Sequence, residues 1–291
     1  MSISKRKRGD RRDGRWLRSL DPYLALTPFI METRQDASNS FIDKVEITDL
    51  DRYIRKKRAE GLKGFGLLHI FVASYVRTVS QRPAINRFVS GKRIYARNNI
   101  EIVMTIKKEM TSTGSETSIK VVFKSDDTVD TVYKKMTESV ASVKDYNSTS
   151  TDNVANTIVR LPRFLLEFFI WLVKRFDYHG WLPQALVDAS PFHGSIVITD
   201  LGSLGIPPVA HHLYNLGNVP VFLAIGAKRR EFELDADGSV SERKYIDYSV
   251  VSDERICDGF YFAQSLKYLR SYFRNPEQLE KPPEQVVEDV C

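Results

Sequence analysis

The chain has 291 residues, of which 42% are hydrophobic and 27% are charged. This balance excludes a disordered or fibrous protein and predicts a globular chain with a sizeable core. The net charge of +6 comes from the first 18 residues, because the remainder carries as many acidic as basic side chains. The basic arm "SKRKRGDRRDGRWLR" could touch phosphate or anionic lipid, but no zinc-finger or RNA-recognition pattern accompanies it. Nucleic-acid binding is therefore not favoured.

Cysteine usage and the N-terminal sequence bear on the compartment. Cys257 and Cys291 are the only cysteines, which excludes a disulfide framework and a thiolate metal site. The charged N-terminus lacks the apolar core of a signal peptide. We therefore expect a cytoplasmic, reducing location and no metal.

The first predicted elements combine strands and helices. "SNSFIDKVEITDL" predicts a strand followed by a helix that Thr48 or Asp49 caps. "FGLLHIFVASYVRTVSQRP" has apolar residues at helical spacing and predicts a core helix that Pro83 ends. His69 lies off the apolar stripe of this helix, so we expect it to be structural or exposed. Residues 93–125 alternate well enough to predict a hairpin around the polar loop "TSTGS".

The middle of the chain is predicted to be helical. "DTVDTVYKKMTESVASVK" predicts one helix, and residues 156–176 predict another that is interrupted near Pro162. The run "FLLEFFIWLV" contains Glu167 and is well short of the ~20 residues that span a bilayer, so it predicts a buried helix. Basic residues flank this run, namely Arg163, Lys174 and Arg175. Contact with a membrane surface is therefore a possible alternative, though not the favoured one.

The last third supplies more strands and a final helix. "GSIVITDLG" and "VPVFLAIGA" predict strands, and "REFELDADG" with "RKYIDYSVV" predicts a hairpin with an Asp-Gly turn. A helix is predicted from Asp258 to about residue 273. The simplest interpretation of the charged stretch "SDERICDG" is that Asp258 caps this helix. Strands and helices do not alternate regularly, which indicates an α/β fold with helices on a mixed sheet.

Three of these segments, in this order, resemble the catalytic domain of 2-oxoacid dehydrogenase acyltransferases and the related chloramphenicol acetyltransferases. They are "GSIVITDLGSLG", "VPVFLAIGA" and "SDERICDGFYFAQSLKYLRSYFRNPEQL". Upstream, "FIDKVEITDLDRYIRKKR", "RPAINRF" and "NNIEIVMTI" are similar as well. The resemblance implies a chloramphenicol acetyltransferase-like mixed-sheet sandwich with flanking helices, assembled as a homotrimer with active sites between subunits. It divides the chain into a basic arm (1–17), an acyltransferase-like domain (18–280) and a tail (281–291).

The resemblance also implies a chemistry. In the family a histidine takes the proton from a thiol, the thiolate attacks an acyl thioester, and a hydroxyl holds the oxyanion. The hydroxyl position falls on Thr199. The aspartate of the His-x-x-x-Asp-Gly motif falls on Asp258, and its arginine partner matches Arg34 best. Glu254 stands at the histidine position.

Glu254 is the departure that matters, because a carboxylate is a weaker base toward a thiol than an imidazole unless burial strengthens it. His211 and His212, in the loop "PPVAHHLYNLG", are alternative bases, although adjacent histidines are also typical of a polar loop. His193, just before the strand of Thr199, is expected to be structural.

We therefore expect a free-standing acyltransferase-like protein that binds CoA or acyl-CoA at a trimer interface and transfers an acyl group to a small-molecule acceptor. The retained Arg255 and Gly259 support this interpretation. No lipoyl domain fits before residue 18, so we expect no lipoyl group on this chain. A non-catalytic relative that binds acyl-CoA or a partner protein is the alternative. The CoA phosphates could meet three basic residues that otherwise form a solvated turn, Lys228, Arg229 and Arg230.

Overall fold

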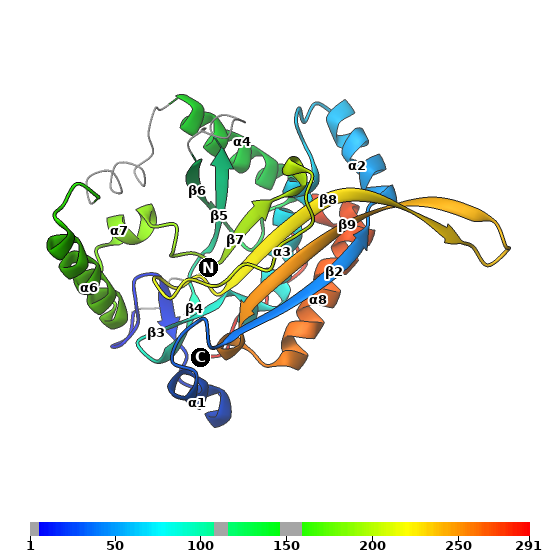
Figure 1. The fold of residues 1–291 in the computed structure, drawn as a ribbon. Coiled ribbons are helices and arrows are strands. Elements are labelled where there is room, and N and C mark those ends of the chain that lie inside the picture. The colour runs from blue at the N-terminus through cyan, green and yellow to red at the C-terminus, as the bar shows by residue number, and fades with distance from the viewer. Residues whose placement is uncertain (1–5, 108–115, 146–158) are drawn as a thin grey trace.

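The computed structural model describes residues 6–107, 116–145 and 159–291, and a six-stranded mixed sheet organises them (Figure 1). The strand order is β2-β9-β8-β7-β5-β6. β7 runs parallel to both of its neighbours, and the other pairs are antiparallel. The bounds are β2 (Ser38–Glu46), β5 (Ile100–Lys107), β6 (Glu116–Phe123), β7 (Ile196–Asp200), β8 (Val221–Leu234) and β9 (Val240–Asp253).

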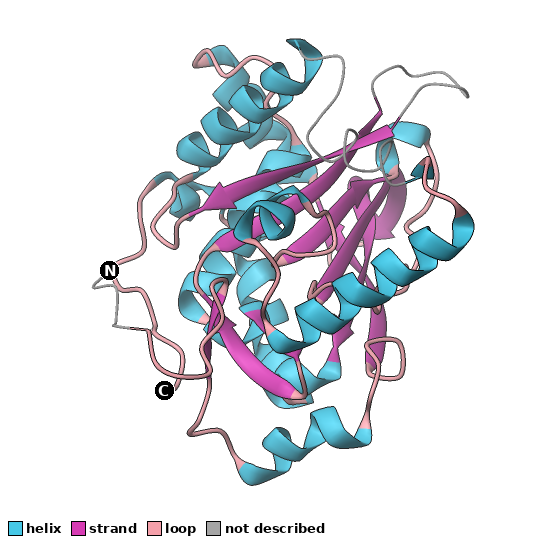
Figure 2. Cartoon of the chain, turned by 90° about the vertical axis from the view of Figure 1, so that its left-hand side faces the viewer, coloured by secondary structure: helices cyan, strands magenta, loops and turns pink. Residues whose placement is uncertain are grey.

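A three-stranded sheet and seven α-helices complete the described part of the chain (Figure 2). The small sheet has the order β1-β4-β3, with β1 (Gly14–Trp16), β3 (Arg87–Ser90) and β4 (Arg93–Arg97). The helices are α1 (Pro22–Ile30), α2 (Thr48–Ala59), α3 (Leu67–Gln81), α4 (Val129–Asp145), α6 (Arg163–His179), α7 (Gln184–Ala189) and α8 (Gly259–Arg274).

The two faces of the large sheet differ in what covers them. Helices α2, α3, α4 and α8 pack on one face, where the main core includes Phe71, Tyr248 and Phe273. The opposite face carries a small apolar cluster that includes Val197 and Phe222, and the loop from 205 to 220 contributes Leu213 to it. The second face is therefore the less deeply covered of the two.

Helix α3 is the central core helix, as predicted. Residues 70–80 are all buried, and Pro83 begins a separate 3₁₀ turn after the helix ends. His69 is structural: its Nδ1 accepts a hydrogen bond from the Gly66 N–H at 3.1 Å, and its ring stacks on Phe65. The hairpins β5–β6 and β8–β9 are confirmed, and Gly238 supplies the left-handed conformation (φ 83°) in the turn of the second.

Two expectations about local structure fail, and a third cannot be compared with the described residues. Strand β2 and helix α2 form as predicted, but Ile47 precedes the helix, and neither Thr48 nor Asp49 caps it. The apolar run does form helix α6, yet Asp177 is its only buried residue, so the predicted buried helix is wrong. The loop "TSTGS" and residues 146–158, which include the start of the predicted 156–176 region, lie outside the described residues.

Both ends of the chain pack on the domain. Arg11 is buried and donates hydrogen bonds to Asp13, Asp177 and Ser90, so the arm is not freely solvated there. At the other end Arg87 Nε donates to Asp289 at 2.7 Å. The domain limits at 18 and 280 stay a prediction.

Candidate active site

The charged stretch after β9 forms two consecutive caps. Asp253 ends the strand and accepts a hydrogen bond from the Arg255 backbone N–H, which starts a single 3₁₀ turn, Glu254–Ile256. Asp258 is exposed and accepts from the Tyr261 N–H at 2.8 Å at the N-terminus of α8. The capping interpretation of Asp258 is confirmed. Gly259 is the first helical residue, with open space around it.

Asp253, not Asp258, is the centre of a buried ionic cluster. Its two oxygens accept from Arg255 Nε at 2.8 Å and Nη2 at 2.7 Å, and Arg34 Nε lies 3.8 Å away. The expected pairing of Arg34 with Asp258 is therefore wrong within one chain. The register explains it, because Asp253 pairs with Ser38, only four residues after Arg34. Burial is the main cause that lowers the pKa of Arg34 to about 10.

Arg34 also fastens a loop to this cluster. Its guanidinium donates to the Tyr214 carbonyl at 2.8 Å and to the Val89 carbonyl at 3.1 Å. Its backbone N–H donates to the Asn215 side chain at 3.1 Å. Arg34 thus connects the turn before β2 with strand β3 and with the loop 205–220.

Glu254 is exposed, and only its backbone is held, through a hydrogen bond from its N–H to the Ala37 carbonyl at 2.8 Å. Within the described residues its carboxylate has no hydrogen bond or ion pair. One chain therefore does not supply the burial that would strengthen this carboxylate as a base. The side chain is free to meet another molecule.

Thr199 lies far from Glu254 in the same chain. Thr199 pairs with Ala224 of β8, which pairs with Ser249 of β9. Glu254 follows Ser249 by five residues, which places it roughly 17 Å further along the sheet at about 3.4 Å per residue. The two residues are thus separated both along the strands and by two strands across the sheet, too far apart to form one site within a single chain.

Thr199 instead shares its surroundings with His211. The His211 ring stacks on Phe222 at 4.3 Å, and Phe222 pairs with Val197, which lies two residues before Thr199 on the same face. Burial, and then the charge of His212, lowers the pKa of His211. Its buried Nε2 has no hydrogen-bond partner in the part of the chain that the structure describes. His211 is therefore the candidate base that one chain brings to the face of Thr199.

The other histidines have different surroundings. His212 is exposed and contacts the edge of Tyr214 at 5.1 Å. His193 is buried, with its Nδ1 2.8 Å from Ser190 Oγ and its Nε2 3.3 Å from Asp177. The structural role expected for His193 is confirmed.

Ser249 is a residue of this face that the sequence analysis missed. It belongs to the row Thr199, Ala224 and Ser249 across three strands, it is buried, and its Oγ has no hydrogen-bond partner among the described residues. Buried hydroxyls are nearly always hydrogen-bonded, so an unpaired one calls for a physical account. In the sequence, the signal for this residue was the position of Ser249 beside two valines in the strand segment "SVVS".

A polar pocket of about 290 Å³ adjoins Arg255. Four cations line it, Arg34, Lys92, Lys174 and Arg255, against two acids, Glu32 and Asp177. Lys92 pairs with Glu32 at 3.2 Å, whereas no acid among the described residues pairs with the exposed Lys174. Burial opposes ionisation of Asp177, but His193 and Arg11 lower its pKa to about 2. The pocket therefore has a cationic excess suited to an anionic group.

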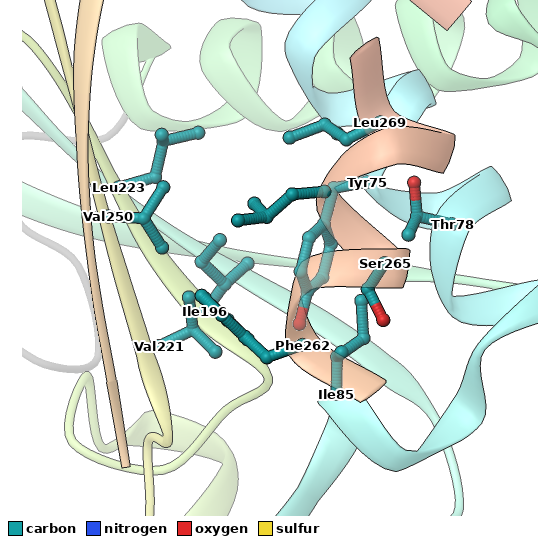
Figure 3. A pocket seen from close by; sticks show the side chains of 11 residues that line it. Tyr75, Thr78, Ile85, Ile196, Val221, Leu223, Val250, Phe262, Ser265 and Leu269 are labelled. Atoms are coloured by element: carbon teal, nitrogen blue, oxygen red, sulfur yellow. The ribbon is translucent and has the colours of Figure 1, made fainter. Parts of the chain in front are cut away.

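An apolar cavity of about 40 Å³ lies on the other side of the sheet, between β7, β8, β9 and helices α3 and α8 (Figure 3). Its hydroxyls are bonded within the chain, because Thr78 donates to the Ser74 carbonyl and Ser265 to the Tyr261 carbonyl. Ile196 and Val250, which line it, face the main core, whereas Thr199 faces away from it. The sheet separates this cavity from the candidate site.

The predicted phosphate-binding residues occupy a strand, not a turn. Lys228, Arg229 and Arg230 continue β8 beyond an irregularity after Ile225. Each pairs with an acid of the same chain: Lys228 with Asp51, Arg229 with Asp247, and Arg230 with Glu242. These pairings do not favour them as phosphate ligands. Among the described residues no cluster of side chains is suited to a metal ion.

The fold is that of chloramphenicol acetyltransferase-like acyltransferases. A probable dihydrolipoamide acetyltransferase from Listeria monocytogenes is 15% identical and matches 90% of this chain and 92% of its own, with a TM-score of 0.55. The catalytic core of the 2-oxoacid dehydrogenase multienzyme complex from Thermoplasma acidophilum is 13% identical, with 90% and 99% covered and a TM-score of 0.53. A chloramphenicol acetyltransferase is 13% identical, with 84% and 92% covered and a TM-score of 0.50.

A family model then identifies the C-terminal part of the chain. Residues 189–280 match the 2-oxoacid dehydrogenases acyltransferase (catalytic domain) family, and this stretch contains Thr199, Glu254 and Asp258. The family resemblance and the predicted mixed-sheet fold with flanking helices are thereby confirmed, whereas the homotrimer stays a prediction. No curated protein matches the chain.

Proposed function

We propose that this protein is an acyltransferase that binds a CoA thioester at a site completed between two copies of the chain and passes the acyl group to a small acceptor. The observation that carries the proposal is the separation of Thr199 from Glu254 along the sheet. Both residues lie in the stretch that matches the family, yet one chain holds them roughly 17 Å apart along the strands and two strands apart across the sheet. In the proposed oligomer, Glu254 of a second copy lies beside Thr199 of the first.

Self-association is supported by two further features. One solved structure with this fold is the cubic core of the pyruvate dehydrogenase multienzyme complex, at 12% identity and a TM-score of 0.52. In this chain the β8–β9 hairpin extends well beyond the body of the sheet (Figure 1) and exposes Phe232, Leu234 and Val240. Exposed apolar side chains at the end of such an arm suit contact with another copy. We propose a homotrimer, as the family resemblance implies.

The proposed reaction uses one residue from each copy. Glu254 takes the proton from the nucleophilic atom of the acceptor, and that atom attacks the thioester carbonyl carbon. The carbonyl oxygen becomes an oxyanion that accepts a hydrogen bond from Thr199 Oγ. Collapse of the intermediate breaks the carbon–sulfur bond, and the CoA thiolate leaves with the proton from Glu254. Asp258 holds the start of α8 and thereby the position of the Glu254 turn.

The polar pocket is our proposed site for the anionic end of CoA. It adjoins Arg255, next to Glu254, and Lys174 at its edge has no acidic partner among the described residues. Lys92→Gln with Lys174→Gln should weaken binding of CoA but leave pantetheine, which lacks the phosphates, unchanged in calorimetry. Equal weakening of both ligands would contradict this assignment.

The decisive test mixes two single variants, Thr199→Ala and Glu254→Gln, by co-expression. Each alone should lose transfer by ~10²-fold or more, measured as thiol release from acetyl-CoA with a panel of acceptors. In randomly mixed oligomers about one quarter of the interfaces hold both intact residues, so about one quarter of the parent activity should return. The control is the double variant, which carries Thr199→Ala and Glu254→Gln in the same chain and should regain no transfer activity.

Two other outcomes would replace this proposal. Robust turnover that Glu254→Gln leaves intact and His211→Ala abolishes would make His211 the base within one chain. CoA binding without turnover would favour the non-catalytic alternative, which the exposed, unpartnered carboxylate of Glu254 supports. In that case Glu254→His should create measurable transfer by supplying an imidazole.

A further inference from the structure

Helix α6 presents an apolar, aromatic surface to solvent. Phe164, Phe168 and Trp171 follow each other at helical spacing and are 69%, 59% and 57% exposed, and Trp181 beyond the helix is 64% exposed. Phe168 and Trp171 stack on one another at 5.9 Å rather than on the body of the protein. Asp177 fixes the C-terminal end of α6 through ion pairs with Arg11 and His193. Such a contiguous apolar surface marks an interaction site.

Basic side chains surround this surface. Arg160, Arg163, Lys174 and Arg175 are exposed along and next to the helix. Glu167 is the one exposed acid of α6, and Arg163 already pairs with it at 2.9 Å. The surface around the aromatic side chains therefore carries a clear positive excess.

Helix α1 also exposes apolar side chains. Tyr23, Phe29 and Ile30 are 81%, 56% and 73% exposed. The polar pocket is lined by Pro28 of α1 and by Lys174 and Tyr178 of α6, so the two helices flank the same opening. Both helices lie at the same side of the molecule in Figure 1, away from α2.

We propose that α6, together with α1, binds the surface of an anionic lipid bilayer. Aromatic side chains enter the boundary between headgroups and acyl chains, and the flanking arginines meet lipid phosphates. The positive excess around the aromatic side chains favours anionic lipid as the occupant of this surface. Among the residues that the structure describes, no helix has the length and apolar character needed to cross a membrane. This inference does not depend on the proposed catalysis.

The test is co-sedimentation of the full chain with phosphatidylcholine vesicles, with and without about 30% phosphatidylglycerol. The parent should bind the anionic vesicles and release in 0.5 M salt, which screens the arginines. The triple variant Phe164→Ser, Phe168→Ser and Trp171→Ser should bind about tenfold more weakly or worse. Because these side chains are exposed, its circular dichroism and thermal unfolding should match the parent's.

Matched controls test whether vesicle binding depends on the α6 surface or on exposed apolar and basic side chains in general. Ile42→Ser and Val122→Ser remove two exposed apolar side chains, on β2 and β6, to which no binding role is assigned, and should leave vesicle binding unchanged. Arg160→Gln, Arg163→Gln and Arg175→Gln should reduce binding to anionic vesicles much more than the charge-matched set on α2, Arg52→Gln, Arg55→Gln and Lys56→Gln.

Two results would overturn the proposal. One is failure of the parent to bind anionic vesicles, or equal binding by the aromatic triple variant. The other is a change in sedimentation coefficient caused by the aromatic triple variant in the absence of lipid, which would assign α6 to a contact between copies. Trp171 adds a direct readout, since its insertion should shift the emission of the parent to shorter wavelength on vesicles, and Trp171→Phe should reduce this shift.

Discussion

Helices α3 and α6 have similar lengths and similarly apolar sequences, yet opposite environments. In α3 residues 70–80 are all buried between the sheet and its neighbouring helices, whereas α6 buries only Asp177. A helical apolar pattern therefore identified both helices but did not show which of them is buried in the core. The difference lies in charge, because α6 has Arg163, Lys174 and Arg175 around its apolar surface.

The largest expected effect is on the free energy of unfolding, when a phenylalanine of α3 rather than one of α6 is replaced by alanine. Phe71→Ala should lower the free energy of unfolding by about 3–5 kcal/mol, because it opens a cavity beneath Tyr248 and Phe273. Phe168→Ala should change it by less than about 0.5 kcal/mol, because the ring is exposed. Urea denaturation of both variants measures the contrast. A loss above about 2 kcal/mol for Phe168→Ala would show that α6 is part of the core.

The second prediction extends the contrast to ion pairs. Asp253→Asn should cost about 3 kcal/mol of unfolding free energy, because it leaves Arg255 and Arg34 buried without their carboxylate. Glu167→Gln on α6 breaks an exposed pair with Arg163 and should cost less than about 0.5 kcal/mol. Urea denaturation at neutral pH compares them, and similar losses would contradict the burial argument.

The smallest effect is a pH dependence at the start of α3. Burial lowers the pKa of His69 from 6.5 to about 4. The unfolded chain therefore binds a proton before the folded chain does, so stability present above pH 6.5 is lost as the pH falls toward 4. The parent should lose about 2 kcal/mol more than His69→Gln over this interval. If the free energies of unfolding of the two proteins changed in parallel with pH, His69 would not titrate in this way.

Local patterns predicted local structure well. Alternation identified the β5–β6 and β8–β9 hairpins, and helical spacing identified α3 and α8, because neighbouring residues determine these elements. The position of β7 between β5 and β8 needs pairing across the whole chain, and no local pattern encodes it. The end of α6 could be placed only approximately, since residues 174–179 contain neither proline nor glycine to end the helix before Gly180.

The candidate site shows the same limit. The residue types at Thr199 and Glu254 were identified from motifs, but their separation follows from the register of three strands. The motif contains two aspartates five positions apart, and only the pairing of β2 with β9 shows that Asp253, not Asp258, faces Arg34. The stacking of His211 on Phe222 likewise depends on a loop whose path the sequence does not indicate.

The Arg34 cluster also bears on the order in which the chain folds. Arg34 bonds Val89, which is 55 residues away, and Tyr214, which is 180 residues away. Closing such long loops costs chain entropy that only an assembled sheet repays, so the cluster should form after the folding transition state. Interactions that form this late act on the unfolding rate and leave the folding rate nearly unchanged. The cluster therefore prolongs the lifetime of the native state more than it guides the chain toward it.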